Sequence, residues 1–148
     1  MSSKIRPYEL VLSVDDNSID RYICSSMVQR FNFAKRVIEF DMASKALEYL
    51  RENVDKPENI PQIIFLDINM PGMNGFEFLE QASKLSVVIN STCCIVMLTS
   101  SVNPDDRQRA ERNPVVKDFI NKPLDQDKLN EIETIFNKHF GFNTQKAG

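Results

Sequence analysis

The sequence has 148 residues, 42% of them hydrophobic and 26% charged, which suits a single globular domain with one core. Its net charge of −3 gives no electrostatic reason to expect a nucleic-acid partner, and neither a basic patch nor a DNA-reading motif is visible. Because no apolar run is as long as a membrane span and the start, MSSKIRPYEL, lacks the apolar stretch of a signal peptide, we expect a cytoplasmic protein that is not inserted in a membrane.

Short apolar runs alternate with stretches of helical periodicity in the first part of the chain. The run Tyr8–Val14 predicts a first strand, and residues 36–40 predict a second. Between them, a recurrence every four positions predicts the apolar face of a helix, formed by Ile19, Ile23, Met27 and Phe31. A second helical stripe follows the second strand and consists of Ala43, Ala46, Leu47 and Leu50. Residues 54–61 are polar with two prolines and predict a loop.

The same alternation continues to the end of the chain. Residues 62–66 and 93–98 are continuous apolar runs, as expected for strands buried on both faces of a sheet. The helix between them is marked by Phe76, Leu79 and Ala82. Residues 105–113 predict a short, highly charged helix, and residues 118–120 predict a short fifth strand. The last helix begins after Asp125 as its N-cap, and its apolar residues are Leu129, Ile132, Phe136 and Phe140.

The order strand then helix thus occurs five times, which predicts a doubly wound α/β fold. Such alternation favours a parallel sheet with helices on both faces, and Rossmann and flavodoxin-like arrangements are the main candidates. We expect this domain to span residues 8–140, with an N-terminal extension at residues 1–7 and a flexible C-terminal tail at residues 141–148. Ligands of such sheets bind beyond the carboxyl ends of the strands.

Polar side chains with distinct chemistry stand at those strand ends. Asp15 and Asp16 follow the first strand, Asp67 follows the third, Thr99 follows the fourth and Lys122 follows the fifth. Three carboxylates brought together repel one another and call for a cation, and hard oxygen ligands select Mg²⁺. A carboxylate can attack phosphorus, and phosphoryl transfer needs positive charge on the phosphoryl oxygens. The central Asp67 is therefore the best nucleophile candidate, with Lys122 and Thr99 placed to bind phosphoryl oxygens.

Each of these signals is weak when taken alone. An Asp-Asp pair after a strand is usually a turn or a helix cap, Lys122-Pro123 is most often a plain loop dipeptide, and Asn74-Gly75 normally indicates only a turn. A threonine after a strand usually starts a loop. Their placement on four strands in this order is what makes the combination specific for phosphoryl chemistry.

Cysteine and histidine chemistry is not indicated. The three cysteines are odd in number and two of them, Cys93 and Cys94, lie inside an apolar run, so we expect Cys24 and this pair to be buried or reduced thiols. With His139 as the only histidine, no zinc-binding spacing is present, and we expect this side chain on a polar helix face.

At this point the sequence resembles the receiver domains of bacterial response regulators, in particular the single-domain, chemotaxis-regulator-like members. The resemblance covers residues 8–140 and is carried by four motifs: VDDNSIDR, IIFLDINMPGMNGFEFL, IVMLTSS and FINKPL. It implies a flavodoxin-like, five-stranded parallel sheet with strand order 2-1-3-4-5. It also implies a phosphorelay protein in two-component signalling that forms an aspartyl phosphate.

The resemblance assigns roles to the metal and phosphoryl ligands. Asp67 matches the phosphoacceptor, Asp16 the direct ligand of Mg²⁺, and Asp15 the acid that holds a water of the metal. Asn69 matches the position whose backbone carbonyl completes the metal shell, and Lys122 matches the lysine that pairs with the phosphate.

The switch and the partners are likewise implied by the resemblance. Thr99 matches the switch hydroxyl, Phe119 matches the aromatic switch position, and the Lys122-Pro123 peptide bond is expected to be cis. The expected partners are a sensor histidine kinase or a histidine phosphotransferase and an unidentified downstream protein. Since no output domain is visible, we expect a stand-alone receiver that catalyses only its own phosphorylation and dephosphorylation and is not otherwise an enzyme.

Three alternative functions are weaker. A phosphatase of the haloacid dehalogenase type would carry an acid two residues after the nucleophile, where this chain has Asn69, which cannot act as a general acid. A pseudo-receiver would keep the fold without being phosphorylated, but the acidic residues, Thr99 and Lys122 are all present. A nucleotide or flavin binder is disfavoured because the sequence has neither a G-x-G-x-x-G fingerprint nor a P-loop.

Overall fold

The computed structural model describes residues 7–141, apart from the side chains of residues 87, 88 and 141. The expected N-terminal extension and flexible tail therefore lie, except for their innermost residue, outside the described residues. Within the described part of the chain, five parallel strands form one sheet in the order β2-β1-β3-β4-β5, as the resemblance implies. The strands are β1 (Tyr8–Val14), β2 (Ala34–Phe40), β3 (Ile63–Leu66), β4 (Cys94–Thr99) and β5 (Val116–Asn121).

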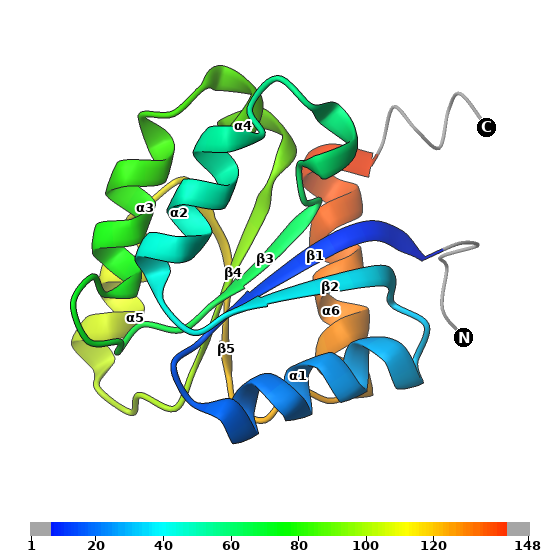
Figure 1. The fold of residues 1–148 in the computed structure, drawn as a ribbon. Coiled ribbons are helices and arrows are strands. Elements are labelled where there is room, and N and C mark those ends of the chain that lie inside the picture. Colours follow the sequence, from blue (N-terminus) through cyan, green and yellow to red (C-terminus); the bar gives the residue numbers. More distant parts are fainter. Residues whose placement is uncertain (1–6, 142–148) are drawn as a thin grey trace.

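Helices cover both faces of this sheet (Figure 1). They are α1 (Ser18–Arg30), α2 (Ala43–Glu52), α3 (Gly75–Ser83), α4 (Val87–Thr92), α5 (Pro104–Glu111) and α6 (Gln126–Phe136). One core cluster joins the sheet to α2, α3, α4 and α5, and a second joins the opposite face to α1 and α6. Among the described residues, no helix has the length and apolar character needed to cross a bilayer.

The central strands are apolar throughout because both of their faces lie inside a core. All four residues of β3 and all six of β4 are buried, which explains why the sequence shows no alternation there. The three cysteines are also buried and unpaired, as expected. Asp125 caps α6 as predicted, because its side chain accepts a hydrogen bond from the backbone N–H of Lys128 at 2.9 Å.

The prediction of five helices missed α4. This helix has only six residues, and its sequence VVINST is rich in β-branched side chains that disfavour helices. Ser86 nevertheless caps it by accepting a hydrogen bond from the backbone N–H of Ile89 at 3.2 Å. The predicted loop at residues 54–61 likewise contains a short 3₁₀ turn, Pro57–Asn59.

The predicted apolar face of α1 is only partly the buried face. Ile19 is 68% exposed, whereas Cys24, Ser25 and Val28 are buried. At 3.6 residues per turn, a four-residue repeat drifts by about 40° per step, so a stripe of three such steps winds roughly a third of the way around the helix. Its C-terminal members, Met27 and Phe31, pack against the core, and its first member faces outward.

Candidate functional site

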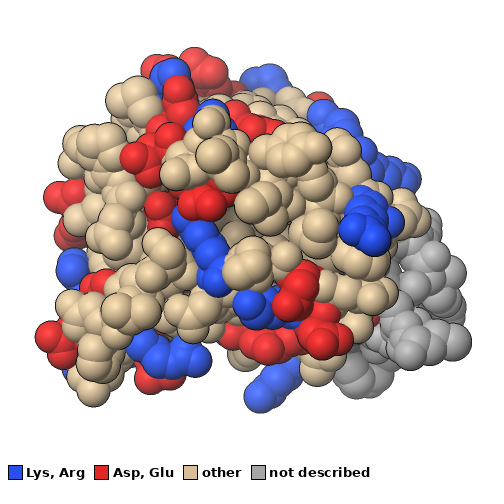
Figure 2. Space-filling model, turned by 90° about the horizontal axis from the view of Figure 1, so that it is seen from below, with Lys and Arg blue, Asp and Glu red and all other residues tan. Residues whose placement is uncertain are grey.

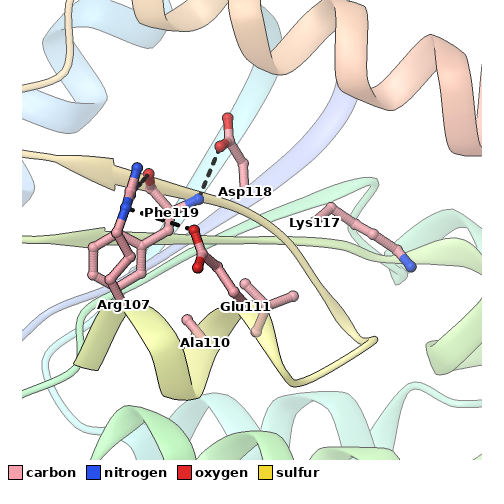
Figure 3. Close-up of a pocket in the computed structure, with 7 residues that line it drawn as sticks. Arg107, Ala110, Glu111, Lys117, Asp118 and Phe119 are labelled. Carbon is pink, nitrogen blue, oxygen red and sulfur yellow. Dashed lines mark hydrogen bonds and ion pairs between the residues drawn. The ribbon is translucent and has the colours of Figure 1, made fainter. Parts of the chain in front are cut away.

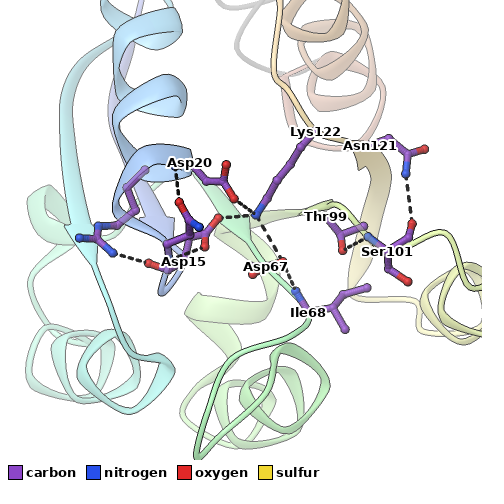
Figure 4. A network of polar contacts seen from close by, with 10 residues as sticks. Asp15, Asp20, Asp67, Ile68, Thr99, Ser101, Asn121 and Lys122 are labelled. Atoms are coloured by element: carbon purple, nitrogen blue, oxygen red, sulfur yellow. Dashed lines mark hydrogen bonds and ion pairs between the residues drawn. The ribbon is translucent and has the colours of Figure 1, made fainter.

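The carboxyl ends of four strands bring the predicted polar side chains together (Figure 4). Parallel pairing aligns these ends: the backbone N–H of Asp67 donates to Val14 O at 3.0 Å, and the N–H of Lys122 donates to Thr99 O at 2.8 Å. Carboxylate oxygens of Asp15, Asp16 and Asp67 all lie within 4.8 Å of one another. The sheet edge thus carries an acidic cluster, named here for these three aspartates.

Burial and repulsion make this cluster unfavourable without a cation. Asp15 and Asp67 are buried, while Asp16 is exposed. Burial, followed by the nearby Asp15 carboxylate, raises the pKa of Asp67 to about 6, against the opposing effect of Lys122. Three hard oxygen ligands, one of them open to water, fit Mg²⁺, an ion that keeps part of its hydration shell.

Lys122 places a cation beside two of these carboxylates and a third one on α1. Its Nζ lies 2.6 Å from Asp15 Oδ2, 2.8 Å from Asp20 Oδ2 and 3.6 Å from Asp67 Oδ1. Burial alone would lower the pKa of Lys122, but hydrogen bonds to Asp15 and Asp20 outweigh this effect and raise it. The Lys122-Pro123 peptide bond is cis, as the resemblance implies. Sequence reasoning missed Asp20, because an acid in the first turn of a helix is ordinary and gives no sign of a distant lysine.

The loop between β1 and α1 is held in place by polar contacts. The backbone N–H of Asn17 donates to Asp15 Oδ1 at 2.9 Å, and Arg21 Nη1 donates to the backbone oxygen of Asp15 at 2.7 Å. Arg21 Nε also lies 3.4 Å from Glu39 Oε1, so α1, β2 and this loop are joined. These contacts orient the Asp15 carboxylate toward the site.

Asn74-Gly75, which alone would indicate only a turn, brings α3 close to Asp67. Asn74 and Glu77 form a capping box at the start of α3. The N–H of Gly75 donates to Ile68 O at 2.8 Å, and a Cβ at this glycine would collide with the backbone oxygen of Asp67. Glycine is therefore required by the close approach of the helix. Asn69, two residues after Asp67, is exposed, and its implied part in the metal shell stays a prediction.

Thr99 and Phe119 lie on one face of the sheet. Thr99 is fully buried, and its Oγ1 accepts a hydrogen bond from the N–H of Ser101 at 3.0 Å. Met97, two residues earlier on β4, pairs in register with Phe119 on β5. Since residues two apart in a strand share a face, Met97 lies on the same face as Thr99 and next to Phe119 on the neighbouring strand.

Phe119 also borders a small pocket between α5 and β5 (Figure 3). Its ring is half-buried and lies under the guanidinium of Arg107, 5.0 Å from the ring centroid. Arg107 Nη1 donates to Phe119 O at 3.4 Å, and its Nε lies 3.7 Å from Glu111 Oε2. On the face of the molecule seen from below, acidic and basic side chains are interspersed over the described residues (Figure 2). The negative charge of the acidic cluster is therefore not part of a larger acidic surface on this face.

Comparison with known proteins gives concordant matches. A model of the response regulator receiver domain matches residues 11–133. The probable methanogenesis regulatory protein FilR2 from Methanothrix harundinacea (strain 6Ac) is 28% identical over 135 residues, which span 90% of this chain and 85% of that protein. The two-component response regulator ORR1 from Oryza sativa subsp. japonica is 32% identical over 124 residues, which span 82% of this chain but only 52% of that protein.

Solved structures show the same similarity. The two-component response regulator from Cytophaga hutchinsonii superposes with a TM-score of 0.83 at 26% sequence identity. The match covers 90% of this chain and 99% of that chain.

Proposed function

This chain belongs to the response regulator receiver domain family of two-component signalling, and from that premise we propose that it accepts a phosphoryl group on Asp67 from a phosphohistidine. The donor is a sensor histidine kinase or a histidine phosphotransferase, the partners with which receiver domains typically interact. Phosphorylation switches a face that binds an unidentified downstream protein. The chain catalyses only its own phosphorylation and dephosphorylation.

The observation that carries this proposal is the position of Asp67 between the other carboxylates of the acidic cluster and the ammonium of Lys122. Its buried carboxylate shares the acidic cluster with Asp15 and Asp16, and the ammonium of Lys122 lies 3.6 Å away. Phosphoryl transfer to a carboxylate needs positive charge beside the phosphoryl oxygens, and the Lys122 ammonium is placed next to Asp67 to supply part of it. Thr99, at the end of the neighbouring strand, adds a hydroxyl.

Each residue of the site has its own role in phosphoryl transfer. An oxygen of the Asp67 carboxylate attacks phosphorus, the P–N bond to the donor imidazole breaks, and the imidazole leaves with that electron pair. Lys122 pairs with the developing charge on the phosphoryl oxygens. Asp15, Asp16, Asp67 and the backbone carbonyl of Asn69 would hold the Mg²⁺ that receiver domains generally bind. When bound, that ion supplies further positive charge to the phosphoryl oxygens.

The switch is proposed to begin at Thr99. Its hydroxyl gives up the hydrogen bond that it accepts from the N–H of Ser101 and instead donates a hydrogen bond to an oxygen of the new phosphoryl group. The movement vacates space beside Met97, and the half-buried ring of Phe119 turns inward to fill it. Since Phe119 has no hydroxyl, packing must drive this rotation, which breaks the contact with Arg107. We therefore place the output face on α5, β5 and α6.

A protein donor must also find a surface beside the site. Ile19 and Tyr22 are 68% and 71% exposed and lie three residues apart on α1, hence on neighbouring positions of one helix face. Val102, in the loop after β4, is 93% exposed. These apolar side chains flank the carboxyl edge of the sheet and are proposed to contact the donor.

Labelling tests the proposal directly. The protein is incubated with Mg²⁺ and either acetyl phosphate or a phosphorylated histidine kinase, and the modified residue is mapped by mass spectrometry. We expect label on Asp67 alone and none in Asp67→Asn. Asp118→Asn is the matched control, because it makes the same change at a partly buried acid on β5 and should be labelled like the wild type. Full labelling of Asp67→Asn would refute the assignment.

A further inference from the structure

Lys122 has a carboxylate partner that the proposed phosphoryl transfer does not use. Asp20 lies 102 positions away in the sequence, in the first turn of α1, and its Oδ2 accepts a hydrogen bond from Lys122 Nζ at 2.8 Å. The side chain of Lys122 is only 11% exposed, and that of Asp20 is 32% exposed. The ammonium points into the space among Asp15, Asp20 and Asp67 and contacts all three carboxylates (Figure 4).

The local structure of α1 places Asp20 but does not account for this ion pair. Asn17 caps the helix and accepts a hydrogen bond from the N–H of Asp20 at 3.0 Å, and an acid in the first turn is favourable next to the helix dipole. Asp127 occupies the equivalent first turn of α6, is exposed, and is not among the three carboxylate partners of Lys122. Helix stabilisation alone therefore does not require a contact with a buried ammonium.

The three partners of Lys122 differ in what a divalent cation would do to them. Asp15 and Asp67 belong to the acidic cluster, so a bound Mg²⁺ would neutralise them and repel the ammonium. Asp20 is not part of that cluster of mutually close ligand atoms. It is therefore the carboxylate that can keep Lys122 when the metal takes the other two.

We propose that Asp20 is a positioning residue that retains the Lys122 ammonium beside the phosphoryl pocket while Mg²⁺ occupies the acidic cluster. This inference rests on the proposed function. Without Asp20, the ammonium remains paired with Asp15 and Asp67 and competes with the metal for them. Asp20→Asn should therefore weaken Mg²⁺ binding, on the order of three- to tenfold, and leave Lys122 without a fixed partner once the metal is bound.

The first experiment measures Mg²⁺ affinity of the unphosphorylated protein by calorimetry in a double-mutant cycle. Asp20→Asn is made in the wild type and in Lys122→Met. A loss of general negative charge lowers the affinity equally in both backgrounds, whereas an effect through the lysine is larger in the wild type. Equal losses in the two backgrounds, or no loss in the wild type, would overturn the inference.

The second experiment follows the ammonium of Lys122 by ¹⁵N NMR. In the wild type saturated with Mg²⁺, the hydrogen bond to Asp20 should keep its signal protected from exchange with water. In Asp20→Asn the signal should be lost when the metal is added. Asp20→Glu, which retains a carboxylate, should restore most of the protection, and Asp127→Asn, which removes an acid from another first helical turn, should behave like the wild type. A signal that persists in Asp20→Asn would overturn the inference.

The outcomes separate this inference from the proposed function. If the wild type binds Mg²⁺ and is phosphorylated on Asp67 while Asp20→Asn is unchanged in both measurements, only the role of Asp20 is wrong. If the wild type does not bind Mg²⁺, the proposed metal site and the role of Asp20 are both wrong. Backbone amide spectra of each variant confirm that the fold is retained.

Discussion

Replacing Asp67 by asparagine should stabilise the fold at neutral pH, because the native site destabilises the ionised carboxyl. The pKa of Asp67 is raised from 3.8 to about 6 by burial and by Asp15. The folded state therefore holds this proton more tightly than the unfolded chain, and stability falls as pH rises from about 4 to 6. A rise of about two in the pKa corresponds to about 3 kcal/mol of free energy of unfolding. This is the largest increase in stability that we expect for Asp67→Asn above pH 6. Asparagine can still accept the hydrogen bond from the N–H of Ile68.

Urea unfolding followed by circular dichroism measures this gain. In the presence of EDTA, Asp67→Asn should exceed the wild type in free energy of unfolding by about 1–3 kcal/mol at pH 7.5, and the difference should nearly vanish at pH 4. Mg²⁺ should reduce this difference in free energy of unfolding at pH 7.5, because the ion binds and stabilises the wild type but not the variant, which lacks one of the carboxylate ligands. Asp41→Asn is the control: it removes an exposed acid whose pKa is lowered by Lys45, and it should not stabilise. A variant no more stable than the wild type, or a gain that is independent of pH, would refute the reasoning.

Three further predictions concern the metal, the output face and the donor. Asp16→Asn should weaken Mg²⁺ binding roughly tenfold or more in a calorimetric titration, and an unchanged affinity would place the ion elsewhere. Beryllofluoride should shift amide signals of residues 105–122, and Phe119→Ala, which forgoes ~1.5–3 kcal/mol of ring burial, should lower the equilibrium constant for the shifted state about tenfold or more. If those amides stay fixed while the site is occupied, output uses another face. Tyr22→Ala should slow transfer from a phosphorylated histidine protein roughly fivefold or more but leave labelling by acetyl phosphate unchanged. Equal slowing with both donors would assign Tyr22 to the site and not to docking.

The sequence by itself determined which segments form the strands of the sheet and which aspartates form the acidic cluster. Alternating apolar runs and helical stripes predicted five parallel strands, and the rule that ligands bind at their carboxyl ends selected Asp15, Asp16 and Asp67, with Thr99 and Lys122 beside them. This worked because β3 and β4 are buried on both faces, which leaves an unbroken apolar signal that ends where the polar residues begin. The strand order came from the family motifs, since periodicity does not encode it.

Tertiary structure alone decided which of these groups contact one another. Periodicity reports burial along one element, so it cannot register that Asp20 on α1 holds the ammonium of Lys122 after β5. It also misjudged α1, because the side of a helix that is buried depends on what packs against it, and Ile19 faces outward. The requirement for glycine at position 75 likewise arises only when α3 meets the backbone oxygen of Asp67. Each of these contacts depends on bringing distant strands and helices together at one edge of the sheet, and that arrangement exists only in the folded chain.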